Sequence, residues 1–149
     1  MVVFIVPVRN FETPPVCLNS ISQLKYPPEK LEVILVAGTQ PSEQRNRGMA
    51  VAKGDLLYFL DDDSSPDSRA LLYLVNAFED FPNVSGIGGP SIGDDKGSDF
   101  QRCVAAAMSS TFGFGPLRFR YLPQGCPRIV GEDELILANF AIRNSVAIS

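Results

Sequence analysis

Three consecutive carboxylates, those of Asp61, Asp62 and Asp63, follow a short apolar run in the stretch DLLYFLDDDSSPDS. Like charges side by side repel one another, so the run needs a nearby counter-charge. Hard divalent cations such as Mg²⁺ and Mn²⁺ prefer carboxylate oxygens as ligands and would supply that charge. The run therefore predicts a cation site. The alternative is a solvated turn, because Asp, Ser and Pro are also common in turns and helix caps.

Two other uses of an acidic run have less support in this sequence. A calcium-binding EF-hand loop needs Gly at its sixth position, and counting from Asp61 that position is Pro66. A phosphoryl-transfer aspartate, as in a receiver domain, follows the first strand of its fold, where this chain has Pro-Val-Arg-Asn. The second use therefore stays open with little in its favour.

The composition excludes several classes of function. Histidine is absent, which rules out Ser-His-Asp catalysis, Cys-His catalysis and His-ligated zinc for these 149 residues. The formal net charge of −4 argues against a nucleic-acid partner. Cys17, Cys103 and Cys126 are widely spaced, which indicates free thiols in a reducing compartment. The sequence shows neither a signal peptide nor an apolar run of membrane-spanning length, so we expect the chain in the cytoplasm.

Strands and helices are predicted to alternate through the first part of the chain. Apolar runs without alternation predict strands covered on both faces, at residues 1–7, 31–38, 55–60 and 84–92. Helices are predicted between them, at 13–26 with Thr13 as N-cap, at 42–53 and at 68–81. Such alternation indicates an α/β fold with a mainly parallel sheet, which binds ligands at the carboxyl ends of its strands. The acidic run falls at that edge.

The second part of the chain is predicted to hold a helix at 101–110, a long loop at 111–128 and a last strand at 133–143. The loop is rich in Gly, Pro, aromatic residues and Arg, and a loop of this length is more often functional than idle. Its Phe112, Phe114 and Phe119 are expected to pack the loop onto the domain; the alternative is a hydrophobic lip for an acceptor.

The order of three motifs resembles the family 2 glycosyltransferases with the GT-A fold. VVFIVPVRN opens the chain, QRNRGMAVAKGDLLYFLDDD carries the acidic run, and VSGIGGP follows one helix later. In that family the first strand ends in a Pro-Val-Tyr-Asn-like turn, and an Arg-Asn-x-Gly precedes a third strand that closes with a D-x-D motif. The resemblance implies a Rossmann-like, mainly parallel sheet flanked by helices, here truncated at its C-terminal end. It also implies a single domain over 1–149, with a nucleotide-sugar donor-binding half at 1–92 and a partial acceptor half at 93–149.

The resemblance also assigns roles to individual residues. Pro7, Val8, Arg9 and Asn10 would line the base and ribose of a nucleotide-diphosphate sugar. Arg45 would face the base or the diphosphate, and Asp62 would belong to the same nucleotide-sugar site. Asp61 would contact the ribose or the metal, and Asp63 would hold the Mg²⁺ or Mn²⁺ that bridges the two phosphates. The implied reaction is metal-assisted transfer of the sugar to an acceptor hydroxyl with inversion.

A narrower resemblance covers AMSSTFGFGPLRFRY and ELILANFAIRNS, which are similar to segments of members that build exopolysaccharide or lipid-linked glycans. It implies a glycan or lipid-linked acceptor, and a location that is cytoplasmic or peripheral to the inner membrane. Arg118 and Arg120, together with Arg128, would grip an acceptor phosphate. The alternative is that they are ordinary surface arginines.

Two departures from the family pattern qualify these expectations. The second strand of the family usually ends in Asp-Asp-Gly-Ser, whose Asp reads the base, whereas Ala37 and Gly38 stand there in this chain. A preference for uracil is therefore not implied. The family's catalytic base lies just after the last predicted strand, in a Gly-Gly-Phe-Asp-Glu-like segment, and the sequence stops at Ser149 without one. Glu132 and Asp133 are the remaining candidates for the catalytic base, but they precede the last predicted strand, whereas the base of the family follows it.

The missing base leaves rival interpretations open. The chain is expected to be truncated or to take its base from another chain, and such a short chain is expected to expose apolar surface and self-associate or bind a missing C-terminal segment. A catalytically silent nucleotide-sugar binding module, or a fragment without its base, is the alternative function. A nucleotidyltransferase is less well supported, because PVRNFE lacks the glycines of its phosphate loop.

Overall fold

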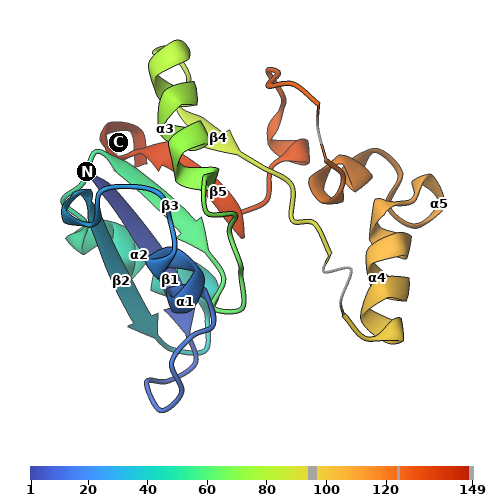
Figure 1. The fold of residues 1–149 in the computed structure, drawn as a ribbon, viewed down its shortest axis with the longest axis horizontal. Coiled ribbons are helices and arrows are strands. Elements are labelled where there is room, and N and C mark those ends of the chain that lie inside the picture. The colour runs from blue at the N-terminus through green and yellow to red at the C-terminus, as the bar shows by residue number, and fades with distance from the viewer. Residues whose placement is uncertain (94–96, 124, 148–149) are drawn as a thin grey trace. The chain divides into compact units, whose positions relative to one another are not determined.

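The computed structural model describes residues 1–93, 97–123 and 125–147 of the chain, and Figure 1 shows its elements. The strands are β1 (Val2–Val8), β2 (Leu31–Ala37), β3 (Leu56–Leu60), β4 (Gly86–Gly88) and β5 (Asn139–Arg143). The α-helices are α1 (Cys17–Ser22), α2 (Pro41–Val51), α3 (Ala70–Asp80), α4 (Asp99–Ser109), α5 (Thr111–Phe114) and α6 (Asn144–Ala147). Short 3₁₀ helices lie at Pro28–Lys30, Gly115–Tyr121 and Glu132–Glu134.

One five-stranded sheet organises the fold, with strand order β2-β1-β3-β5-β4. β1 pairs in parallel with β2 on one side, from Val2 opposite Leu31 to Val8 opposite Ala37. On its other side β1 pairs in parallel with β3, from Val2 opposite Leu56 to Ile5 opposite Phe59. The predicted α/β fold with a mainly parallel sheet is therefore confirmed.

The core lies on both faces of β1, every residue of which is buried. Successive side chains of a strand point to opposite faces. Phe4 and Val6 accordingly join one apolar cluster, which α1 and α3 cover with Cys17 and Leu71. Val3, Ile5, Leu57 and Phe59 form the other cluster, against which Met49 and Ala52 pack at the end of α2. Burial on both faces explains why β1 and β3 read as continuous apolar runs.

Gly48 allows α2 to approach the sheet closely. A Cβ on Gly48 would lie 2.5 Å from Cγ2 of Ile5, a distance that real Cβ contacts do not reach. The sequence shows Gly48 only as a residue that weakens a helix. The structure shows that its missing side chain places α2, and the residues α2 carries, directly over β1.

The described chain divides into two compact units, one of residues 1–87 with 140–149 and the other of residues 88–139. The predicted boundary between residues 92 and 93 falls five positions after the first division, and β5 leads the chain back into the first unit. The roles predicted for the two halves stay predictions. None of the described helices has both the length and the apolar character needed to cross a membrane.

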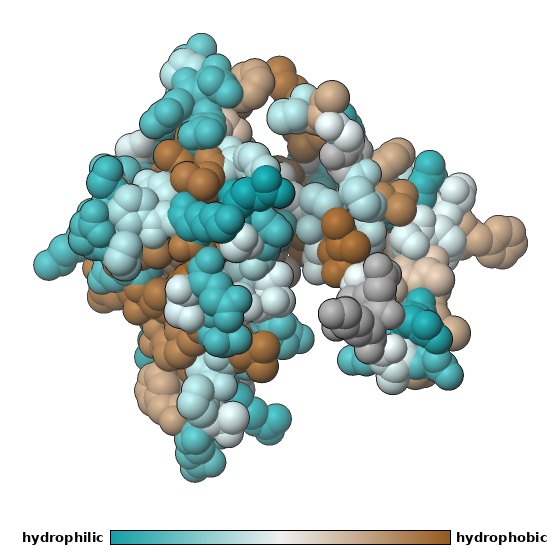
Figure 2. Space-filling view, in the orientation of Figure 1, coloured by the Kyte–Doolittle hydropathy of each residue, from teal (hydrophilic) through white to brown (hydrophobic). Residues whose placement is uncertain are grey.

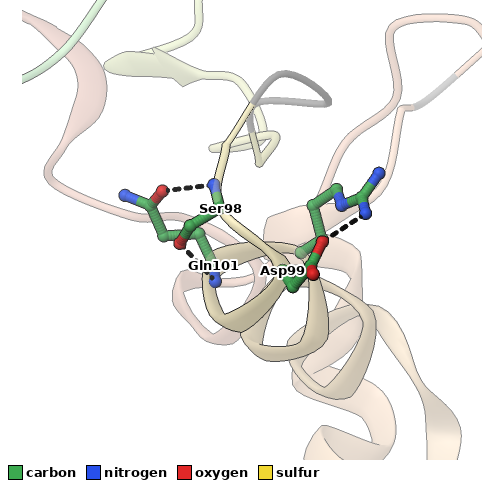
Figure 3. A network of polar contacts seen from close by, with 4 residues as sticks. Ser98, Asp99 and Gln101 are labelled. Atoms are coloured by element: carbon green, nitrogen blue, oxygen red, sulfur yellow. Dashed lines mark hydrogen bonds and ion pairs between the residues drawn. The ribbon is translucent and has the colours of Figure 1, made fainter.

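The second unit is built around α4, which starts with a reciprocal cap. Ser98 Oγ accepts a hydrogen bond from the Gln101 amide at 3.3 Å, and Gln101 Oε1 accepts one from the Ser98 amide at 2.8 Å (Figure 3). Asp99, in the first turn, pairs with Arg102 at 2.6 Å. This capping box satisfies amides that the first helical turn leaves unpaired.

Apolar side chains reach the surface of the second unit. Phe100 on α4 is 78% exposed and Phe112 on α5 is fully exposed. Figure 2 shows apolar residues, drawn tan and brown, at the surface over α4 and α5. The exposure of Phe112 does not fit the expectation that this residue packs the loop onto the domain. Phe114 and Phe119 are less exposed, and the ring of Phe114 meets Tyr121 edge-on.

Several predicted elements differ from the observed ones. Thr13 is not a helix cap, because α1 begins at Cys17 and its N-cap is Val16. The fourth strand is only Gly86–Gly88. The last strand begins at Asn139, since residues 132–134 form a 3₁₀ helix and residues 135–138 belong to no strand. Part of the predicted loop is helical as α5 and the 3₁₀ helix that follows it. The predicted strand at 133–143 was therefore too long by six residues at its start.

Candidate active site

The candidate site lies where the sheet changes its winding direction. The chain passes from β1 outward to β2 and then returns to β3 on the other side of β1. In open α/β sheets such a switch point leaves a crevice outside the carboxyl ends of the two strands, here β1 and β3. Arg9 and Asn10 follow β1 and are exposed, and the acidic run follows β3. Because β1 and β3 are adjacent parallel strands, the two turns lie at the same edge of the sheet.

Arg45 and Asp61 form an ion pair at this edge. Nη2 of Arg45 donates to Oδ1 of Asp61 at 2.7 Å, and the side chains are 14% and 44% exposed. Ser64 holds the turn, since its amide donates to the Asp61 carbonyl at 3.1 Å and its Oγ accepts from the Asp61 amide at 3.2 Å. Two residues that sequence analysis assigned separately are thus brought together, and part of the charge of the acidic run is balanced from within the chain.

Nε of Arg45 is buried and has no hydrogen-bond partner among the described residues. A buried donor without an acceptor costs free energy, on the order of 1–3 kcal/mol. The guanidinium group therefore has one contact to a carboxylate and a second donor that lacks an acceptor. Because Nε is buried, an anionic ligand can meet only the exposed part of this guanidinium group, and phosphate oxygens suit the planar fork of arginine.

Asp62 and Asp63 are exposed, and the described residues form no ion pair with either of them. The Asp62 carbonyl accepts a hydrogen bond from the amide of Cys17 at 3.0 Å. Burial of the Cys17 thiol, together with the negative charges of Asp62 and Asp63, raises the pKa of Cys17 to about 11. Cys17 is therefore a protonated thiol at neutral pH, and its side chain lies in the core cluster.

Gln44 is a site-building residue that sequence analysis missed. Its side chain is 3% exposed, and its Nε2 donates to the Val8 carbonyl at 2.9 Å and to the Val36 carbonyl. Because both acceptors are backbone oxygens, Gln44 fastens the end of β1 to the end of β2. A Cβ on Gly38 would lie 3.1 Å from Cδ of Gln44, so a side chain at position 38 would press on this amide.

The first turn of the candidate site offers mainly Arg9 and Asn10 to a ligand. Pro7 and Val8 are the last residues of β1 and are buried, and Val8 belongs to the core cluster. Asn10 Oδ1 accepts a hydrogen bond from the Glu12 amide at 3.0 Å, which shapes the turn. Contact of Pro7 and Val8 with a nucleotide stays a prediction, and their burial leaves their backbone as the part that can make it.

The acidic run fits a divalent cation only with ligands from elsewhere. No group of three or more Cys, Asp or Glu side chains suited to a metal occurs in the described parts of the chain. Mg²⁺ and related ions are commonly held by one or two carboxylates together with phosphate oxygens of a substrate. Asp61 and Asp63 match that mode. Among the described residues Asp63 forms no ion pair, and Asp61 forms one, with Arg45. The donor set suits an ion that arrives with a diphosphate.

The arginines and carboxylates predicted for acceptor and base belong to the second unit, where Arg120 contacts the backbone of Glu132 and Asp133. Arg120 donates through Nε to the Asp133 carbonyl at 2.6 Å, and its Nη2 reaches the Glu132 carbonyl at 3.5 Å. The side chains of Glu132 and Asp133 are exposed. These contacts join Arg120 to the 3₁₀ helix at Glu132–Glu134.

Arg118 lies over the ring of Phe119 at 4.7 Å, and Arg128 lies over the same ring at 5.5 Å while pairing with Glu134. The hydrogen bond from Arg128 lowers the pKa of Glu134. These arginines thus have partners inside their own unit. Their predicted role at an acceptor phosphate stays a prediction.

Comparisons with known proteins agree with this geometry. The solved structures of S. aureus TarS 1-349, and of the same protein in complex with UDP, resemble the chain with TM-scores of 0.53 and 0.52 at 20% identity. Each match covers 65% of this chain and 37% of TarS 1-349, so the chain spans little more than a third of that protein. The complex of TarS 1-349 with UDP-GlcNAc matches with a TM-score of 0.50 at 20% identity, covering 65% and 36%. No curated protein matches the sequence.

These structural matches establish the GT-A fold predicted from the motifs. The sequence model of glycosyl transferase family 2 matches residues 21–136, which include α2, β3 and the acidic run. A sheet of this topology, an acidic turn after β3 and a match over most of the chain lead to one conclusion: the chain belongs to glycosyl transferase family 2.

Proposed function

We propose that this chain binds a nucleotide-diphosphate sugar at the carboxyl ends of β1 and β3 and transfers the sugar to an acceptor hydroxyl with inversion, assisted by Mg²⁺ or Mn²⁺. The observation that carries the proposal is the Arg45–Asp61 ion pair at the switch point, which places a cationic and an anionic side chain together at this edge of the sheet. Membership of the family supports sugar transfer, and structures of TarS with UDP and UDP-GlcNAc support a nucleotide-sugar donor.

The residues would divide the work as follows. Arg9 and Asn10 in the first turn would bind the nucleoside, and Arg45 would donate to the diphosphate. Asp63, with Asp61, would hold the cation, which supplies Lewis-acid stabilisation of the leaving diphosphate. Arg45 would stabilise the same developing negative charge from the protein side.

The proposed reaction is a direct displacement. The acceptor oxygen forms a bond to the anomeric carbon as the bond from that carbon to the diphosphate oxygen breaks, and the electron pair leaves with the nucleoside diphosphate. A carboxylate base takes the proton of the acceptor hydroxyl. Within this sequence Glu132 and Asp133 remain the candidates for that base.

Calorimetry with UDP, in Mn²⁺ and in excess chelator, tests the donor site. We expect UDP to bind the wild-type chain in Mn²⁺ and at least about tenfold more weakly in chelator, because the cation joins the phosphates to the carboxylates. Asp63→Ala should remove this difference without lowering the melting temperature, since it relieves repulsion in the run. Asp80→Asn changes an exposed carboxylate at the end of α3 and is the matched control. Equal affinity with and without Mn²⁺ in the wild type would contradict the proposal.

Binding of the donor without transfer is the second candidate function. The observation that favours it is the place of Glu132 and Asp133, whose backbone carbonyls bind Arg120 within the second unit and whose side chains are exposed. Incubation with UDP-GlcNAc and a panel of acceptors separates the two functions. Transfer to any acceptor supports the enzyme, and donor binding with no transfer supports the binding module.

A further inference from the structure

We propose that Arg45 is a positioning residue that makes the binding of the divalent cation and of the nucleoside diphosphate depend on each other. The inference rests on the proposed function, and goes beyond it by assigning to one side chain the coupling between two ligands. Arg45 would hold Asp61 when the diphosphate is absent and release it when the diphosphate is present.

The contact that carries the inference is the ion pair across the edge of the site. Nη2 of Arg45 and Oδ1 of Asp61 are 2.7 Å apart, and the guanidinium group is the more buried partner at 14% exposure. A cation that arrives alone must take Asp61 from Arg45 and then lie beside an unpaired positive charge. Since like charges at close range repel strongly in a partly buried site, Arg45 opposes the binding of the free cation.

The exposed part of the Arg45 guanidinium group gives the second half of the inference. A diphosphate placed there provides a negative charge for the guanidinium group and replaces Asp61 as the acceptor of its Nη2 donor. Arg45 then no longer needs Asp61, and the carboxylate becomes available to the cation together with Asp63. The same anion that pairs with Arg45 thus frees a ligand for the metal.

Mutual dependence follows from these exchanges. If the diphosphate raises the affinity for the cation by some factor, the cation raises the affinity for the diphosphate by the same factor. Asp61 and Asp63 supply two carboxylates, and Mg²⁺-type ions held by one or two carboxylates commonly take substrate phosphate oxygens as further ligands. Removal of Arg45 should therefore strengthen binding of the cation alone and weaken binding of the diphosphate.

The test compares Arg45→Gln with a matched control, Arg47→Gln. Arg47 is exposed, lies two residues further along α2, and its loss changes the net charge by the same amount. Mn²⁺ binding without nucleotide is measured from the electron paramagnetic resonance signal of free Mn²⁺. UDP binding is measured by calorimetry in saturating Mn²⁺ and in chelator, and the ratio of the two affinities is the coupling factor. Binding of Mn²⁺ to UDP in solution is the same for every variant and cancels in the comparison.

We expect Arg45→Gln to bind Mn²⁺ alone more tightly than the wild type and to lower the coupling factor about tenfold, within the usual range for coupled ligands. Arg47→Gln should leave both quantities within about twofold of the wild type, as expected for a charge with no contact in the site. Unchanged Mn²⁺ affinity and unchanged coupling in Arg45→Gln, in a chain that still binds UDP with Mn²⁺, would overturn the inference and leave the proposed function standing. Failure of the wild type to bind any of UDP, GDP, ADP and dTDP in Mn²⁺ would overturn the proposed function itself.

Arg45→Lys separates the two halves of the argument and serves if Arg45→Gln does not fold. Lysine keeps the positive charge beside Asp61 but loses the planar fork of donors. We expect its affinity for Mn²⁺ alone to match that of the wild type, while UDP binds several-fold more weakly. Tighter Mn²⁺ binding by Arg45→Lys, or an unchanged affinity for UDP, would contradict the role of the charge or of the donor fork respectively.

Discussion

At the scale of single residues, the types and the order of the site side chains were predictable, but their pairing was not. The acidic run and Arg45 were both assigned to the donor site from the motifs that surround them. Their ion pair depends on how α2 lies over the sheet, and that placement follows from the missing side chain of Gly48. No local pattern connects residues 45 and 61. Sequence analysis could therefore name these ligands without seeing that one of them neutralises another.

Gln44 is a second residue whose contacts with distant parts of the chain could not be predicted from the sequence. A glutamine early in a helix is ordinary in sequence, and nothing in its neighbours distinguishes it. Its importance lies in two backbone carbonyls, of Val8 and Val36, which belong to different strands. A signal that sequence could have offered is the neighbouring glycine at position 38, whose lack of a side chain leaves room for the Gln44 amide.

The thiols provide a prediction at this scale. Cys103 and Cys126 are exposed, whereas Cys17 is buried, and burial with the nearby charges of Asp62 and Asp63 raises the pKa of Cys17 to about 11. We expect two thiols to react with Ellman's reagent at pH 8 within minutes and the third to react only after unfolding, because the thiolate is the reactive form. Cys17→Ser is the control, and it should lose only the slow phase. Three thiols that react at one rate in the folded chain would contradict this burial.

At the scale of elements, the sequence predicted strands correctly where an apolar run also pairs with a neighbouring strand. β1 and β3 are continuous apolar runs that are buried along their whole length, whereas β2 is a half-buried edge strand. The bounds of all three were predicted within one residue at each end. The apolar residues Leu135, Ile136 and Leu137 also resemble a strand, yet they follow a 3₁₀ helix and pair with no strand. An apolar run predicts that its residues are buried. It does not predict whether a neighbouring strand is available for hydrogen bonding.

The prediction of a loop after α4 was wrong in part for a different reason. Gly113, Gly115 and Pro116 are signals of turns, and they led to the prediction of a loop. Ser110 instead caps a short helix by accepting from the Gly113 amide at 2.9 Å, and Gly115, at φ 54°, ends that helix. Glycine and proline stand at the ends of α5 and of the 3₁₀ helix that follows it. They do not indicate that this segment lacks helices.

The strand clamp at Gln44 gives a prediction about an element. Gln44→Leu keeps the approximate volume but removes a donor from the Val8 and Val36 carbonyls in a buried place. We expect the free energy of unfolding to fall by about 1–3 kcal/mol, measured by urea denaturation. Gln40→Leu is the control, because Gln40 is exposed and makes no side-chain hydrogen bond at the start of α2. Equal stability of the two variants would show that the clamp contributes nothing.

At the scale of the whole molecule, the two compact units differ in how much they bury. The first unit contains both apolar clusters, with Phe4, Ile5 and Leu57 fully buried. Among the described residues of 88–139, no side chain is buried. A segment with few buried apolar contacts opens at a lower free energy than a core strand does.

Hydrogen exchange measures this difference. We expect the amides of β1 and β3 to exchange at least about 10³-fold more slowly than those of α4, since local opening ranges from almost no cost up to the global free energy of unfolding. α3 is the internal control, because it has the same length as α4 but buries Leu71, Leu74 and Phe78. Protection of α4 equal to that of α3 would mean that α4 is held by contacts beyond those described.

The strand order has a consequence for the time at which the fold can form. β5 lies between β3 and β4 although it comes last of the five along the chain, more than fifty residues after β4. On the ribosome, β1 to β3 can pair as soon as they emerge, but β3 then keeps an unpaired edge and β4 has no neighbour. β3 and β4 can pair fully only once β5 is present. Its pairing closes a long loop, and loop closure of this kind is entropically costly and slow. The sheet can therefore be completed only after Asn139–Arg143 has been synthesised, and until then β3 keeps an open edge.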